Sequence, residues 1–190
     1  FARDKERCEY ARRIESEPSC RATIKLYDHL QSKALREGRE VPLLSDYGES
    51  LEIVKLALKG RIEVEYGLED RKEEIIERLF ENALKKTCEE IYARMPQERF
   101  DEFYETLRSC SMEIDGEKFI PINLNLIPKL RSFDVVNFYV SEVTGLREID
   151  DQLYLSAIDI MLQAMSLCIP RYVNRKNGGY ILREIVKDET

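Results

Sequence analysis

Few of the residue types that carry out catalysis occur in this sequence at spacings that would bring them together. His29 is the only histidine, so two histidines cannot share a metal ion or relay a proton. It follows Tyr27 and Asp28 in a segment with helical spacing, where we interpret it as a half-exposed helix residue. The sequence therefore predicts no histidine-based catalytic or metal site.

Neighbouring carboxylates are the second candidate chemistry, because Mg²⁺ prefers oxygen ligands. Such pairs occur at Glu69-Asp70, Glu73-Glu74 and Asp101-Glu102. Adjacent helical residues point about 100° apart, which is more typical of solvated helix faces than of a shared ion.

The sequence also has no glycine-rich phosphate-binding loop, because Gly178-Gly179 is not followed by the Lys-Ser/Thr of such a loop. We expect no catalytic residue, no metal ligand and no cofactor.

A stripe of short or neutral polar residues marks the most apolar segment of the chain, residues 150–169. Its members share one helix face at steps of three and four: Gln152, Ser156, Asp159, Gln163 and Ser166. Exposed faces elsewhere in the chain consist of Glu, Lys and Arg, so this stripe predicts partial burial. It would lie either beneath the chain's own hairpins or against a protein partner.

The segment 171–187 is basic within an acidic protein. Cations and tyrosines are interleaved along it: Arg171, Tyr172, Arg175, Lys176, Tyr180 and Arg183. Such a mixture lets a surface hold phosphates while aromatic rings stack on bases, so these residues are candidate nucleic-acid contacts. The alternative is that the tyrosines pack on the helix 150–169 and the cations protect an edge strand from aggregation.

Apolar residues at helical spacing, followed by helix-ending residues, predict the elements that position these candidates. Ile24, Tyr27, Leu30 and Ala34 recur on one face of a helix in the range 19–38. The N-terminal stretch 3–16 has the spacing of a short terminal helix.

The longest helical pattern runs from about residue 67 to residue 95. Pro128 begins a helix that Gly145 ends, and Asp150 is placed to cap the next helix, which Pro170 terminates.

Two β-hairpins interrupt this helical pattern. Asp115-Gly116 tolerates the positive φ angles of a type I′ turn, which predicts a hairpin over about 112–122. Asn177-Gly178-Gly179 predicts a second hairpin over about 171–186. Alternating residues in 61–66 indicate one further short strand.

Composition indicates a folded, intracellular chain. Apolar residues make up 43% of it and charged residues 35%, with a net charge of −7, which argues against a chain that coats nucleic acid as a whole. Its opening is too charged for a signal peptide, and no apolar run is long enough to span a membrane. The five cysteines are widely separated, which favours reduced core thiols and a cytoplasmic location. Richness in Glu, Lys and Arg is also typical of thermophile proteins.

The sequence therefore predicts a mainly α, compact multi-helix domain over 1–190 with one or two small β-hairpins. The alternative subdivision lies near residue 110, with helices in 1–110 and helices plus hairpins in 111–190. We expect a soluble, non-catalytic binding or scaffolding module, a subunit of a protein assembly or a homo-oligomer. The first alternative is a nucleic-acid-associated protein that contacts phosphates through 171–187. The second is an enzyme whose carboxylate or cysteine site has no recognisable spacing.

Overall fold

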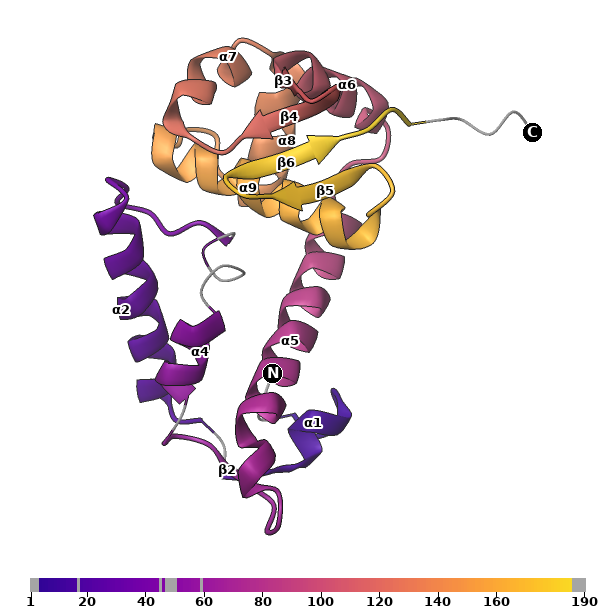
Figure 1. The fold of residues 1–190 in the computed structure, drawn as a ribbon. Coiled ribbons are helices and arrows are strands. Elements are labelled where there is room, and N and C mark those ends of the chain that lie inside the picture. The colour runs from indigo at the N-terminus through magenta and orange to yellow at the C-terminus, as the bar shows by residue number, and fades with distance from the viewer. Residues whose placement is uncertain (1–3, 17, 45, 47–50, 59, 186–190) are drawn as a thin grey trace, which may run out of the picture. The chain divides into compact units, whose positions relative to one another are not determined.

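The computed structural model describes residues 4–16, 18–44, 46, 51–58 and 60–185. Over these residues the chain is mainly helical, with one two-stranded and one four-stranded antiparallel sheet, as Figure 1 shows. This confirms the predicted fold class. The chain divides into two compact units, one reaching to Thr87 and the other beginning at Cys88. The predicted single domain, with its alternative subdivision near residue 110, stays a prediction.

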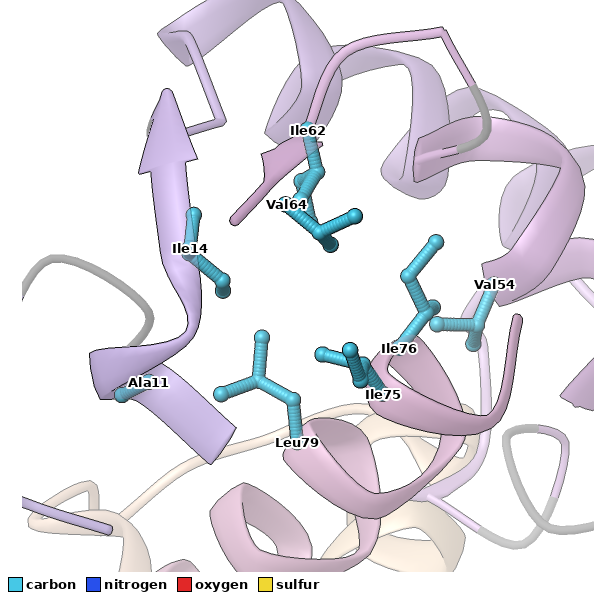
Figure 2. Close-up of a cluster of buried hydrophobic side chains, with 8 residues drawn as sticks. All are labelled: Ala11, Ile14, Val54, Ile62, Val64, Ile75, Ile76 and Leu79. Carbon is cyan, nitrogen blue, oxygen red and sulfur yellow. The ribbon is translucent and has the colours of Figure 1, made fainter. Parts of the chain in front are cut away.

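The first unit is built around a cluster of aliphatic side chains. Its elements are α1 (Glu9–Arg12), β1 (Ile14–Ser16), α2 (Cys20–Arg36), α4 (Leu51–Leu58), β2 (Glu63–Val64), η1 (Glu69–Arg71) and the start of α5 (Lys72–Arg94). Figure 2 shows the cluster, to which Ile14 contributes from β1, Val54 from α4 and Leu79 from α5. Burial of these side chains is the main stabilising contribution within this unit.

The N-terminal stretch departs from its predicted helix. Only Glu9–Arg12 are helical, and Ile14–Ser16 form a strand that pairs antiparallel with β2, with Ile14 opposite Val64. The pairing places Ile14, which is 1% exposed, in the core. The prediction of a helix over 3–16 was therefore wrong, because the partner strand lies about fifty residues away, beyond the reach of local periodicity.

Helix α2 begins after Ser19, and Gly38, with φ of 75°, follows its end. Its buried residues are Ala22, Leu30 and Ala34. Ile24 and Tyr27, which the spacing also assigned to the buried face, are each 58% exposed. The helix itself was predicted correctly, but two of the four residues that the spacing assigned to its buried face are exposed.

The second unit begins within α5 and continues through helices that pack against a four-stranded sheet. Its further elements are α6 (Phe100–Cys110), β3 (Met112–Ile114), β4 (Glu117–Pro121), η2 (Leu124–Leu126), α7 (Ile127–Arg131), α8 (Asp134–Thr144), α9 (Asp151–Cys168), β5 (Val173–Lys176) and β6 (Gly179–Leu182). The long helix predicted over 67–95 is confirmed as η1 and α5. The single helix predicted from Pro128 to Gly145 is two helices, because the chain is extended at Phe133, with φ of −107° and ψ of 118°.

Both predicted hairpins are present, and they join into one sheet of order β3-β4-β6-β5. Asp115 and Gly116 both have positive φ, 52° and 79°, as a type I′ turn requires. The join is the antiparallel pairing of β4 with β6, in which Ile120 lies opposite Tyr180. The last residue of the second predicted hairpin, 186, lies outside the described residues.

Helix α9 is the most buried helix of the second unit, as predicted. The Asp150 carboxylate accepts a hydrogen bond from the Leu153 N–H at 2.8 Å and caps its first turn. Six large residues along it are buried: Tyr154, Leu155, Ile158, Met161, Leu162 and Met165. Among the described residues, no helix combines the length and the apolar character that crossing a membrane requires.

Candidate binding site

The structure buries most of the polar stripe of α9. Ser156, Asp159 and Gln163 are 6%, 0% and 5% exposed. Gln152 and Ser166 are half-buried, and the Ser166 hydroxyl donates to the carbonyl of Gln163 at 2.8 Å. As a set, these residues do not form an exposed surface. Their placement favours the internal-contact alternative over a partner interface.

Two members of the stripe meet the second hairpin through Tyr180. The Tyr180 hydroxyl lies 2.8 Å from Asp159 Oδ1 and 3.0 Å from Gln163 Oε1. The hydroxyl has one proton, which it donates to Asp159. Rotation of the Gln163 side-chain amide by 180° would exchange Oε1 and Nε2, so that Nε2–H donates to the oxygen of the same hydroxyl. Burial, together with the nearby Asp159 carboxylate, raises the pKa of Tyr180 well above its ordinary value. This is a closed polar cluster inside the core.

Removal of the Tyr180 hydroxyl tests this cluster. We expect Tyr180→Phe to lower the free energy of unfolding by about 2–3 kcal/mol, because the buried Asp159 carboxylate loses a donor. The matched control is Tyr104→Phe, whose single hydroxyl proton lies between the carbonyl oxygens of Tyr172 and Arg183, so that about 1 kcal/mol is lost. Urea unfolding of both variants, followed by circular dichroism, measures the difference. Equal losses would show that Asp159 does not depend on Tyr180.

The predicted nucleic-acid contacts of the second hairpin do not share one surface. Tyr180 is 1% exposed, so its ring cannot stack on a base, and in this respect the predicted contact set was wrong. Tyr172 and Arg175 are half-buried. The exposed cations are Arg171, Lys176 and Arg183, of which Arg183 lies 3.4 Å from the Glu117 carboxylate. Phosphate contact by these cations stays a prediction, without the stacking platform that motivated it.

The cysteines of the core are poor nucleophiles. Burial raises the pKa of Cys88 to about 11 and also raises the pKa of Cys110. A thiol with a raised pKa stays protonated near neutral pH, whereas the thiolate is the reactive form. Cys20 is exposed, so the interpretation of all five as core thiols was wrong for this residue.

An apolar pocket that the sequence analysis missed opens where α8 ends and α9 begins. It has a volume of about 320 Å³, and its apolar lining comes from α5, α8, α9 and the loop between the last two: Ile91, Val143, Leu146, Leu153, Ala157 and Ile160. Leu146 is 48% exposed. The pocket also contains Thr144 and Ser156, but the Thr144 hydroxyl donates to the Val140 carbonyl at 2.7 Å and so serves its own helix. The pocket therefore offers mainly hydrocarbon to a ligand.

A second pocket, also of about 320 Å³, shares Leu146 with the first and is more polar. The Arg131 guanidinium lies 4.4 Å from the centre of the Tyr154 ring. Its Nε donates to Asp151 at 2.9 Å and its Nη2 to the Ile149 carbonyl at 2.7 Å. This stacked and bonded guanidinium is therefore held rigidly at the pocket.

The residues around Arg131 fix its position further. The Tyr154 hydroxyl donates to Asn137 Oδ1 at 2.8 Å, and Asn137 Nδ2 donates to the Arg131 carbonyl at 2.9 Å. Burial raises the pKa of Tyr154 to about 12, so this donor persists at neutral pH. Arg147, which also lines the pocket, is exposed and forms no ion pair within the described part of the chain.

The two pockets lie next to each other in the second unit. Leu146 lines both the mainly apolar pocket and the pocket that holds two guanidinium groups. Within the described ranges, no group of three or more His, Cys, Asp or Glu residues could hold a metal ion. The available sequence signal was an apolar Leu146 beside a cation, Arg147, in a short loop that joins two helices.

Comparison with known proteins adds no relative: no protein-family model, no curated protein and no solved structure matches this chain.

Proposed function

We propose that this chain is a non-catalytic binding or scaffolding module that acts as a subunit of a protein assembly. The observation that carries the proposal is the apolar pocket beside the half-exposed Leu146. Protein interfaces concentrate their binding energy in apolar anchors that fill such pockets, surrounded by a polar rim in which Arg is enriched. Arg131 and Arg147 supply such a rim here.

The chemistry of the pockets specifies the partner surface that would fit. An aliphatic or aromatic side chain of the partner would enter the pocket lined by Val143, Leu153 and Ile160. A carboxylate of the partner next to this side chain would meet Arg147, which no carboxylate among the described residues neutralises. The rigid placement of Arg131 lowers the entropic cost of such a contact.

The protonated thiols of the core and the closed Tyr180 cluster also support a non-catalytic role. Catalytic groups need access to a substrate and a pKa near the working pH. Cys88 and Asp159 are each 0% exposed. They suit a stable core better than a reactive site.

Leu146→Asp tests the proposal. The substitution places a carboxylate on the rim of the apolar pocket, and because Leu146 is half-exposed in a loop, the fold is retained. We expect at least about a tenfold loss of the bound partner, the size of effect expected when an interface anchor is removed. Affinity capture from the cells that make the protein, with quantitative mass spectrometry, measures this loss. Sedimentation velocity measures it if the partner is a second copy.

The matched control is Leu167→Asp, which changes another leucine of the second unit that is 40% exposed. Leu167 does not line either pocket. The control is expected to retain the partner. Equal recovery with Leu146→Asp and with the unmodified chain would contradict the proposal, and equal loss in both variants would show that general surface hydrophobicity was measured instead.

A further inference from the structure

Helix α2, which belongs to the first unit (Figure 1), carries a second line of apolar side chains beside its buried face. Ala22, Leu30 and Ala34 are at most 1% exposed, whereas Ile24, Tyr27 and Leu35 are 58%, 58% and 59% exposed. Single exposed apolar residues are common, but three large ones on one helix face are not explained by the need to cover the surface.

The exposed apolar residues, together with the half-buried Gln31, form a regular line along the helix. Cys20, Ile24, Tyr27, Gln31 and Leu35, here called the α2 seam, follow one another at steps of four, three, four and four. Such steps keep side chains on one narrow face, as in the contact line between two packed helices. At about 1.5 Å per residue the seam is about 22 Å long, long enough for a helix of several turns to lie along it.

Positive charge accompanies the seam on one side only. Arg21, Lys25 and Arg36 each directly follow a seam residue, so all three are displaced about 100° in the same direction around the helix. All three are exposed, and no ion pair within the described ranges involves them. Asp28 is the acidic residue on this side. The edge is therefore basic in a chain whose net charge is −7.

We propose that the α2 seam docks an amphipathic α-helix of a protein partner whose apolar stripe is flanked by carboxylates. Apolar side chains of the partner would pack on Ile24, Tyr27 and Leu35. Its carboxylates would pair with the basic edge, which selects the partner and sets its orientation. This inference rests on α2 alone and is independent of the pockets beside Leu146.

The charges disfavour a second copy of α2 as the occupant. In an antiparallel pair of identical helices, like edges face each other with the helix ends exchanged, so Arg21 would meet Arg36 of the other copy at each end of the pair. In a parallel pair, the basic edge would face Thr23, Leu26 and Ala34, which carry no carboxylate. A helix of different sequence, with carboxylates beside its apolar residues, could both pack on the α2 seam and pair with its basic edge.

Two designed peptides test the proposal on the full chain. Both are helical, with leucines at the spacing of the seam; one carries glutamates beside its leucines and the other carries lysines. Fluorescence anisotropy of the labelled peptides is expected to show at least tenfold tighter binding of the glutamate peptide. Arg21→Glu with Lys25→Glu is expected to reverse this preference. The exposed positions of both substitutions leave the helicity of the chain unchanged.

The matched control is Lys85→Glu with Arg94→Glu, which makes the same change of net charge at exposed positions on α5. It is expected to leave the preference for the glutamate peptide intact. Equal binding of both peptides, or binding of neither, would overturn the proposal. Tighter binding to phosphatidylserine vesicles than to the glutamate peptide would also overturn it and identify the seam as a lipid contact.

Discussion

Gly179→Ala is expected to lower the free energy of unfolding by at least about 3 kcal/mol, among the largest effects of any single methyl group in this chain. A Cβ at position 179 would lie 2.1 Å from the Ile120 carbonyl oxygen and 2.9 Å from the Pro121 Cα. Both are backbone atoms of β4, so neither can rotate away. The strands β4 and β6 must separate, and this pairing is the only one that joins the two hairpins within the described residues.

The neighbouring Gly178 supplies the control. Its φ is 77°, but no heavy atom lies within 4 Å of the Cβ position, so Gly178→Ala meets only the backbone preference of an L residue, about 1 kcal/mol. Denaturant unfolding of the two variants measures the loss of unfolding free energy in each. The loss in Gly179→Ala reports the steric clash with β4, and the loss in Gly178→Ala reports the backbone preference alone. A loss for Gly179→Ala no larger than that for Gly178→Ala would contradict the close approach of β4 to β6.

The elements that local sequence determines were predicted well. Asp150 marked the start of α9 because a carboxylate accepts the free N–H groups of a first turn, and this depends only on neighbouring residues. Asp115-Gly116 marked its hairpin for the same reason, since both residues tolerate positive φ. In each case the physical cause lies within four residues of the signal.

The misassigned elements depend on partners that are distant in the chain. Ile14 is in a strand because β2 pairs with it, and Tyr180 is buried because Asp159 and Gln163 lie beneath it. Periodicity shows that a residue faces the core but not which element covers it.

The pocket and the α2 seam escaped prediction for a related reason. A pocket arises from several elements at once, so the spacing of Val143, Leu153 and Ile160 along the chain does not reveal it. Apolar residues of α2 occur at helical spacing on two of its faces. The spacing alone does not show that Leu30 is buried while Ile24 is exposed. The choice between the faces is made by the rest of the unit, through packing.

Unfolding of the second unit at alkaline pH is the other large expected effect. Four of its tyrosines are at most 2% exposed: Tyr104, Tyr139, Tyr154 and Tyr180. Burial raises the pKa of Tyr139 and of Tyr154 to about 12 and raises the other two still further above the ordinary value. Between the ordinary value of about 10 and these raised values, the folded state holds protons that the unfolded state has released.

The sign of the effect follows from this difference in bound protons. Below about pH 10 these tyrosines are protonated in both states and contribute no pH dependence. Above it, each one lowers the free energy of unfolding by about 1.4 kcal/mol per pH unit, so four lower it by about 5 kcal/mol per unit. Cys88 adds a similar loss that starts about one unit lower. Domains are stabilised by about 5–15 kcal/mol, so we expect cooperative unfolding between about pH 11 and 12.

Tyrosinate absorbance and far-ultraviolet circular dichroism, recorded on the same samples, measure this transition. The buried tyrosines are expected to ionise together with the loss of helical ellipticity. Tyr139→Phe removes one of these five titrating groups, so it is expected to reduce the slope of stability against pH above 10 by about one fifth. Ionisation of every tyrosine while the helices persist would contradict the burial of these four rings, because a phenolate cannot remain unhydrated in an apolar core.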